Sequence, residues 1–375
     1  MVLLIGNYAP DRQQSMQRFG QMMLDGLTTA GVSAELLKPE PVFGNFRLAG
    51  GFVAKWLAYV DKFVLFPRRL RARLRAAQPE IVHICDHSNA MYVEQVPASI
   101  PVVVTCHDLL AVRGALGEET DTPASFTGRF LQRWILQSLR RVTAIASVSR
   151  ATQDDAEKLV RQENGRPRLQ VIPLGLSYPY CKLDQAETQT RLAQITGVKL
   201  PYVLHVGSNL RRKNREAILR IFARGREQWP GQLVFVGERL HEELSALAAT
   251  LDIGDRVVEL GPRDCPELEA LYNGATAFLF PSRFEGFGWP IIEAQACGCP
   301  VLCSSTAPMG EVAGNGALVR DPADEEGFAQ DLLRLTNPAE RELWSAHALE
   351  NAQHFTTAKM IAGYQALYRS LAPRP

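Results

Sequence analysis

Two glutamates, Glu285 and Glu293, flank a glycine-containing loop in the most informative stretch of the chain. Gly288 lets the main chain approach a ligand closely, and Pro290 is typical of the first turn of a helix. The N–H groups at a helix start, with the helix dipole behind them, bind anions, and a diphosphate suits this geometry best. A carboxylate beside a phosphate site can accept hydrogen bonds from sugar hydroxyls, so two carboxylates could hold two sugars.

The glycine loop also has a purely structural interpretation. A strand, a loop, a helix and a second strand in succession are common in α/β proteins. A glutamate near the helix start then only complements the helix dipole. The loop by itself does not decide between these two interpretations.

The residue order after Glu285 resembles the signature of a known enzyme family. E-G-F-G-W-P-I-I-E is followed by A-x-A-C-G-x-P-V. This order is similar to that of retaining, nucleotide-sugar-dependent glycosyltransferases of family 4, the glycosyl transferases group 1, which have the GT-B fold. The resemblance implies that Glu285 contacts hydroxyls of the donor sugar and that Glu293 holds the ribose of the nucleotide. It also implies that the amides of Phe287 and Gly288 face the donor phosphate or sugar.

A basic loop at residues 207–214 could supply positive charge to the same site. Lys213 lies between a predicted strand and a predicted helix, where the helix dipole attracts the same anion as the ammonium group. The resemblance implies that Lys213 neutralises the donor diphosphate. The family's arginine after Gly207 is replaced here by Ser208, and Arg212 is expected to take its part. The alternative is a solvated basic helix start.

The resemblance implies two further residues of the donor site, His107 and Arg263. His107, in T-C-H-D-L, follows a predicted buried strand and resembles the first-domain histidine that faces the donor sugar. Arg263 follows a strand where relatives hold the base by main chain, so contact with the base is expected there.

Short apolar strands alternate with helices along the chain, which predicts parallel sheets covered on both faces. The first set of predicted strands is residues 2–5, 33–37, 81–84, 101–105, 142–147 and 169–172. The second set is residues 202–206, 232–236, 257–259, 275–280, 300–303 and 317–319. Ligands gather at the carboxyl ends of parallel strands, so Asn7, Asp86 and His107 are expected to converge.

The length of 375 residues suggests two domains. The resemblance implies an α/β protein of GT-B architecture, with two Rossmann-like domains whose parallel sheets face each other across a cleft. We expect an acceptor-side domain over residues 1–178, a linker near residues 177–185 and a nucleotide-sugar-binding domain over residues 186–355. A last helix within residues 356–375 is expected to return to the first domain, as it does in the family.

The composition, with 46% hydrophobic and 22% charged residues, is ordinary for a soluble globular protein. No basic leader or membrane-spanning run appears, so a cytoplasmic location is expected. The net charge of +1 gives no reason to expect nucleic acid as a partner. Seven cysteines without a framework pattern indicate reduced thiols. Cys297, Cys299 and Cys303 are expected to be buried thiols, and we expect neither a metal nor a cofactor.

An arginine cluster from Arg68 to Arg75 holds five arginines beside several aromatic residues. Such a cluster can bind anionic lipid headgroups. The alternative is an amphipathic helix whose apolar side is core and whose arginine side is solvated. Residues 1–180 carry a formal charge of +5 and the remainder −4, which places the positive excess in the first domain. Peripheral contact with the inner membrane surface is therefore a hypothesis.

The expected function is retaining transfer of a hexose from a nucleotide-sugar donor to a glycan or lipid-linked acceptor. F-E-G-F-G and H-D-L look most like the bacterial mannosyltransferase branch, so GDP-mannose is the expected donor. One alternative is a nucleotide-sugar 2-epimerase of the same fold, which needs acid and base groups near C2 of the sugar. Another is a non-catalytic nucleotide-sugar-binding subunit, whose mark would be the loss of Glu285, Lys213 or His107.

Overall fold

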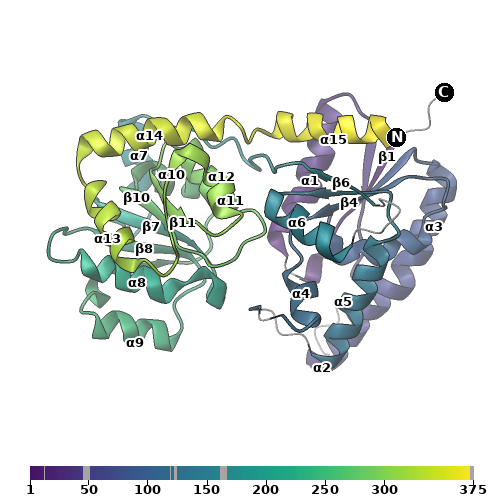
Figure 1. The fold of residues 1–375 in the computed structure, drawn as a ribbon, viewed down its shortest axis with the longest axis horizontal. Helices are drawn as coiled ribbons and strands as arrows, with labels where there is room; N and C mark the ends of the chain where they lie inside the picture. The colour runs from purple at the N-terminus through teal and green to yellow at the C-terminus, as the bar shows by residue number, and fades with distance from the viewer. Residues whose placement is uncertain (12, 45–50, 119, 122–124, 161–166, 372–375) are drawn as a thin grey trace. The chain divides into compact units, whose positions relative to one another are not determined.

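The computed structural model describes the chain except residues 12, 45–50, 119, 122–124, 161–166 and 372–375, and describes only the backbone of residues 51–55. The chain divides into two compact units, as Figure 1 shows. Unit 1 comprises Met1–Ser177 and Thr357–Pro375, and unit 2 comprises Tyr178–Thr356. Each unit holds one parallel six-stranded sheet, which confirms the predicted α/β class with two Rossmann-like domains.

Unit 1 has the strand order β2-β1-β3-β4-β5-β6. Its strands are β1 (Val2–Ile5), β2 (Ala34–Leu37), β3 (Ile81–Ile84), β4 (Val102–Cys106), β5 (Ala144–Ser147) and β6 (Arg168–Val171). Its longer helices are α1 (Gln14–Thr29), α2 (Gly51–Val60), α3 (Phe66–Ala77), α5 (Phe126–Leu139), α6 (Arg150–Leu159) and α15 (Thr357–Leu371). The central strands are buried along their whole length and mostly apolar, with His83 and Thr105 as buried polar exceptions, as expected for a parallel sheet covered on both faces.

Unit 2 has the strand order β12-β11-β10-β7-β8-β9. Its strands are β7 (Tyr202–Gly207), β8 (Gln232–Gly237), β9 (Val257–Leu260), β10 (Ala277–Phe280), β11 (Val301–Ser304) and β12 (Ala317–Arg320). One group of contacting helices is α8 (Arg215–Arg224), α9 (Glu242–Thr250) and α13 (Glu325–Arg334). A second group is α7 (Gln185–Leu192), α10 (Cys265–Gly274), α11 (Trp289–Ala296) and α14 (Pro338–Ala352). All twelve predicted strands are therefore confirmed, with small shifts at their ends.

The last helix, α15, packs in unit 1 beside α1 (Figure 1). The hydroxyl of Tyr368 lies 2.7 Å from Nδ1 of buried His83. The hydroxyl of Tyr364 lies 2.7 Å from Oγ1 of Thr105. These side-chain contacts join α15 to β3 and β4 across a long separation in sequence.

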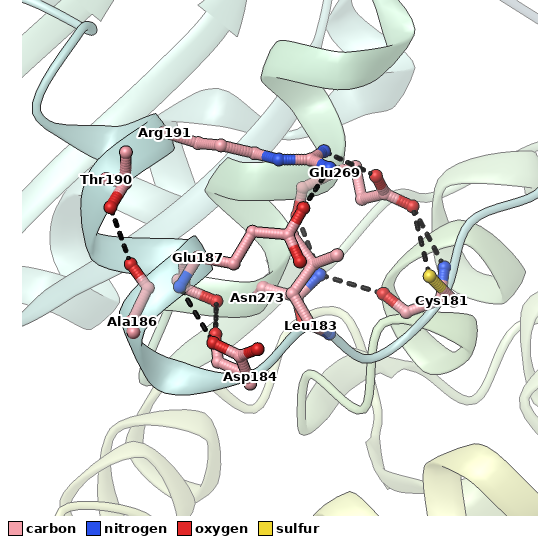
Figure 2. Close-up of polar contacts among 10 residues, drawn as sticks. Cys181, Leu183, Asp184, Ala186, Glu187, Thr190, Arg191, Glu269 and Asn273 are labelled. Atoms are coloured by element: carbon pink, nitrogen blue, oxygen red, sulfur yellow. Dashed lines mark hydrogen bonds and ion pairs between the residues drawn. The ribbon is translucent and has the colours of Figure 1, made fainter.

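The predicted linker at residues 177–185 holds the boundary between the units, but most of it is bound to unit 2. Glu269 on α10 accepts hydrogen bonds from the amide of Cys181 at 3.0 Å and from Arg191 at 2.8 Å (Figure 2). Asn273 accepts from the amide of Leu183 at 2.8 Å. Glu269 is buried, and a buried carboxylate is tolerated only when such partners satisfy it. The sequence indicated a linker here but not this anchoring.

The cysteines at the end of α11 and in β11 are buried thiols, as predicted. Burial raises the pKa of Cys303 to about 12, so this thiol is protonated at neutral pH. Among the helices that the structure describes, none is both long and apolar enough to cross a bilayer.

Candidate active site

The two loops that carry the predicted site residues of unit 2 follow neighbouring strands. β7 and β10 are parallel, with Leu204 opposite Phe278, so the loops after them leave the same edge of the sheet. The amide of Arg283 donates to the main-chain oxygen of Arg212 at 2.7 Å, which joins the loops directly. Sheet order thus brings together segments that are distant in sequence.

Glu285 and two basic residues form a charge cluster where these loops meet. Nζ of Lys213 lies 2.7 Å from Oε1 of Glu285. Nη1 of Arg212 lies 2.6 Å from Oε2 of the same carboxylate. The side chains of Glu285 and Lys213 are only 9% and 11% exposed. The structure therefore brings together three of the residues that the sequence analysis assigned to one site.

Charge pairing sets the protonation states in this cluster. Burial alone would raise the pKa of Glu285, but Lys213 and Arg212 outweigh burial and lower the pKa below its usual value. Burial lowers the pKa of Lys213, and Glu285 opposes that shift. The ring of Phe280 also lies 4.8 Å from the Lys213 ammonium, which favours its charged form. Two cations with one carboxylate leave a net charge of +1 that can attract an anion.

Lys213 lies in a short 3₁₀ turn, Arg211–Lys213, and not in α8 itself. Asn214 follows in the left-handed conformation and donates to the main-chain oxygen of Pro281 at 3.1 Å. The reversal at Asn214 separates Lys213 from the first turn of α8. Lys213 thus lies in the loop between β7 and the start of α8, where the sequence analysis placed it.

Gly288 controls the entry to α11. Its φ of 101° lies in the left-handed region, and an added Cβ would lie 3.2 Å from Cδ1 of Ile291. This position therefore requires glycine. Pro290 lies in the first turn of α11, as predicted. Phe287 is buried with its ring 5.8 Å from that of Phe355, so only its main chain is left for the predicted donor contact.

The other predicted contacts in unit 2 also have protein partners. Tyr272 donates to Oε2 of buried Glu293 at 3.1 Å. Arg263 pairs with Glu267 in the first turn of α10 at 2.9 Å. Gly207 adjoins the charge cluster, because an added Cβ there would lie 3.5 Å from Cδ of Lys213. The contacts of Glu293 with ribose and of Arg263 with the base stay predictions.

Polar residues of unit 1 gather at the carboxyl ends of β1, β3 and β4, which confirms their predicted convergence. Nδ2 of Asn7 donates to Asp86 at 2.5 Å. Nε2 of His107 donates to the main-chain oxygen of Cys85 at 3.0 Å. A carbonyl can only accept, so Nε2 carries the proton and Nδ1 is a hydrogen-bond acceptor. Burial lowers the pKa of His107 although Asp86 opposes the shift, so the imidazole is neutral at pH 7.

Comparison with known proteins covers both units. The family model for glycosyl transferases group 1 matches residues 200–337, and the model for glycosyltransferase family 4 matches residues 30–177. The fold is similar to that of sucrose-phosphate synthase from Thermosynechococcus elongatus, with a TM-score of 0.74 and 20% identity over 99% of this chain and 98% of that one. The chain belongs to the group 1 glycosyltransferases, which have the GT-B fold.

Two enzymes of known name are similar to this chain in sequence. O-antigen chain mannosyltransferase B of Escherichia coli is 29% identical over 251 residues, 64% of this chain and 65% of that protein. A D-inositol 3-phosphate glycosyltransferase of Acidothermus cellulolyticus is 29% identical over 292 residues, 73% of this chain and 63% of that protein. The chain thus spans slightly less than two thirds of the length of these relatives.

Asp61 anchors the loop after β1, and the sequence analysis did not single it out. It lies in a π-helical turn, Asp61–Leu65, between α2 and α3 and is buried. Its carboxylate accepts from the hydroxyl of Tyr8 at 2.7 Å and from the amides of Phe43 and Gly44 at 3.0 and 2.9 Å. It therefore fixes the loop after β1 to residues 43–44. The sequence feature that could have pointed to Asp61 is a single acidic residue within an apolar, aromatic stretch.

The arginine cluster on α3 is partly paired. Arg69 lies 2.6 Å from Glu40, and Arg73 donates to Glu35 at 2.8 Å. Phe66, which the sequence analysis placed beside the cluster as one of its apolar neighbours, belongs to the core. The burial of Phe66 agrees with the structural interpretation, whereas Arg69 and Arg73 are paired with carboxylates and not only solvated.

Proposed function

We propose that this protein is a retaining hexosyltransferase that uses a nucleoside-diphosphate sugar, with GDP-mannose as the first candidate. The observation that carries the proposal is the Lys213–Glu285–Arg212 cluster at the carboxyl ends of β7 and β10. Breaking a glycosyl–phosphate bond leaves a diphosphate with new negative charge. A fixed cluster of net charge +1 in a largely buried site stabilises that charge.

Glu285 is proposed to serve the sugar as well as the two cations. An ionised carboxylate has about four lone-pair sites, of which Lys213 and Arg212 each use one. The remaining sites can accept hydrogen bonds from sugar hydroxyls. Such charge-assisted bonds are roughly twice as strong as neutral ones, so they orient the sugar while the cations address the phosphates.

The proposed mechanism proceeds with retention at the anomeric carbon. The sugar becomes oxocarbenium-like as the nucleoside diphosphate leaves. The acceptor hydroxyl attacks on the side of the leaving group and passes its proton to a donor phosphate oxygen, which acts as the base. Nδ1 of neutral His107 is proposed to accept a hydrogen bond from a sugar hydroxyl.

The choice of mannose, and of a glycan or lipid-linked acceptor, rests on similarity to relatives. The Escherichia coli relative is named a mannosyltransferase of the O-antigen chain. The actinobacterial relative is named for an inositol phosphate acceptor instead. We favour the glycan or lipid-linked acceptor because F-E-G-F-G and H-D-L resemble the mannosyltransferase branch.

The test is to incubate the purified protein with GDP-mannose, UDP-glucose and other nucleotide sugars, with and without glycan acceptors. We expect nucleoside diphosphate release from GDP-mannose that depends on the acceptor. We also expect a product whose anomeric configuration, measured by NMR, matches that of the donor. Formation of a 2-epimer would contradict transfer and favour the epimerase. Tight binding without turnover of any donor would favour a binding subunit.

We further propose that unit 1 contacts an anionic bilayer. Arg68, Arg71 and Arg75 have no ion pair with a carboxylate among the residues that the structure describes. On α5, Phe126 and Phe130 are 89% and 73% exposed, one helical turn apart. Exposed aromatic side chains and basic residues are both typical of interfacial membrane binding, and each basic residue near the surface contributes about 1 kcal/mol.

A further inference from the structure

A small basic pocket lies at the carboxyl edge of the unit 2 sheet, apart from the predicted donor contacts. Its volume is about 230 Å³, and it is lined by the loop after β7, the start of α9 and Arg283. Three arginines face it, Arg211, Arg215 and Arg283, and Glu216 is its one carboxylate. None of the residues assigned to the donor belongs to its lining.

The positive charge of this pocket is largely uncompensated. Most other arginines of unit 2 are paired, for example Arg191, Arg320 and Arg334. By contrast, the side chains of Arg211 and Arg283 form no ion pair or hydrogen bond within the described part of the chain. Glu216 lies 3.7 Å from Arg220 on the same helix. Guanidinium groups gathered without carboxylates favour an anion as the missing partner.

Arg215 forms a buried wall of the pocket. It is only 3% exposed, and its terminal nitrogens donate to Oδ1 of Asn209 at 2.5 Å and to the main-chain oxygens of Glu238 at 2.8 Å and Gly207 at 2.6 Å. These hydrogen-bond partners are neutral, and the carboxylates of Glu238 and Glu259 lie near enough to oppose the effect of burial, which lowers the pKa of the guanidinium. Its Nε is buried and has no hydrogen-bond partner among the described residues. Arg215 is nonetheless held by the protein itself, and the guanidinium groups free to bind an anion in the pocket are those of Arg211 and Arg283.

We propose that this pocket binds a phosphate monoester at a site separate from that of the donor diphosphate. The two unpaired guanidinium groups of Arg211 and Arg283 can each donate to oxygens of a phosphate. The pocket is smaller than the roughly 300 Å³ at which sites for larger organic ligands begin, so it fits a phosphate and not a whole nucleotide. Free phosphate and the phosphate of a sugar phosphate share this chemistry.

The bound phosphate would contact both loops that build the charge cluster. Arg211 directly precedes Arg212, and the amide of Arg283 is bonded to the main-chain oxygen of Arg212. The ligand thus bridges the loop of Lys213 and the loop of Glu285. The site lies wholly within unit 2, and its existence does not depend on which donor the enzyme uses.

The test is equilibrium dialysis of the full chain with inorganic phosphate and, separately, with a hexose 6-phosphate. The variants are Arg211→Gln with Arg283→Gln, Lys213→Ala, and Arg226→Gln as the matched control. Arg226 is an arginine of the same unit whose side chain bonds the main-chain oxygen of Leu251. Arg211 and Arg283 are both exposed, so their replacement leaves the fold intact, and circular dichroism verifies this.

We expect one phosphate per chain for wild type, for Arg226→Gln and for Lys213→Ala. The double arginine variant should bind at least about tenfold more weakly, because charge-assisted hydrogen bonds are lost. Tighter binding of the hexose phosphate than of inorganic phosphate assigns the site to a sugar phosphate, and equal affinities assign it to free phosphate. The proposal is overturned if wild type shows no saturable binding. It is also overturned if only Lys213→Ala loses the phosphate, since the anion would then occupy the donor site.

Discussion

Nζ of Lys213 lies 2.7 Å from Oε1 of Glu285, and this contact ties the loop after β7 to the loop after β10. Both side chains are largely buried, so neither charge can rely on water for its partner. Removing Glu285 would leave Lys213 without a carboxylate, and breaking a buried pair in this way typically costs about 3–5 kcal/mol. Removing Lys213 would leave Glu285 paired with Arg212. The pair is therefore both a structural joint and the centre of the proposed site.

Replacing Glu285 by Gln should lower turnover at least about a hundredfold while the protein stays folded. The amide keeps the shape but loses the charge that holds the two cations and accepts from the sugar. Steady-state kinetics with the best donor measures the effect. Glu326→Gln is the control, since Glu326 is an exposed glutamate paired with Arg224 at 3.2 Å. Turnover within a few-fold of wild type would remove Glu285 from the reaction.

Lys213→Ala should weaken binding of a nucleoside diphosphate by about tenfold or more and leave nucleoside binding nearly unchanged. The reason is that the ammonium addresses only the phosphates, and a hydrogen bond to a charged group contributes about 1.5–3 kcal/mol. Isothermal titration calorimetry with both ligands measures the difference. Lys199→Ala removes an exposed lysine of unit 2 as a control. Equal weakening of both ligands would place Lys213 outside the phosphate site.

Arg68→Ser with Arg71→Ser should reduce sedimentation of the protein with anionic vesicles. Each residue lost near the surface removes about 1 kcal/mol of attraction. Phe126→Ser with Phe130→Ser should weaken the same sedimentation by removing the exposed aromatic pair. A wild-type protein that stays in the supernatant at low salt would contradict membrane contact.

Stability should fall as the pH drops below about 6.5, because His83 is buried as a neutral imidazole. Burial lowers its pKa to about 3, whereas an unfolded histidine has a pKa of about 6.5. Between these values the unfolded state binds a proton that the folded state does not, which costs up to about 1.4 kcal/mol per pH unit. Denaturant unfolding at several pH values measures this slope.

His83→Gln should reduce the slope of unfolding free energy against pH by the equivalent of about one bound proton. This holds whether or not the substitution changes the stability at pH 7. His205→Asn should do the same, because burial also lowers the pKa of His205 to about 3. The prediction is tested by comparing the pH slopes of the variants and wild type, and not their absolute free energies of unfolding. Unchanged slopes in both variants would show that these histidines are not the source of acid sensitivity.

Much of the fold could be predicted from the sequence because local patterns specify it. Short apolar runs in regular alternation with helices fix the strands, and parallel strands buried on both faces need such runs. Gly288 and Pro290 marked the start of α11, because their backbone preferences act within a few residues. The spacing of Glu285 and Glu293 and the position of Lys213 carried the family resemblance.

Only the tertiary structure decided which of these residues are partners. Strand order places β7 beside β10, so Lys213 meets Glu285, and no local pattern encodes that neighbourhood. The same packing pairs Arg69 and Arg73 with carboxylates but leaves Arg211 and Arg283 unpaired in a pocket. Charge interactions depend on distance and burial in space, and both are set by the long-range assembly of the sheet.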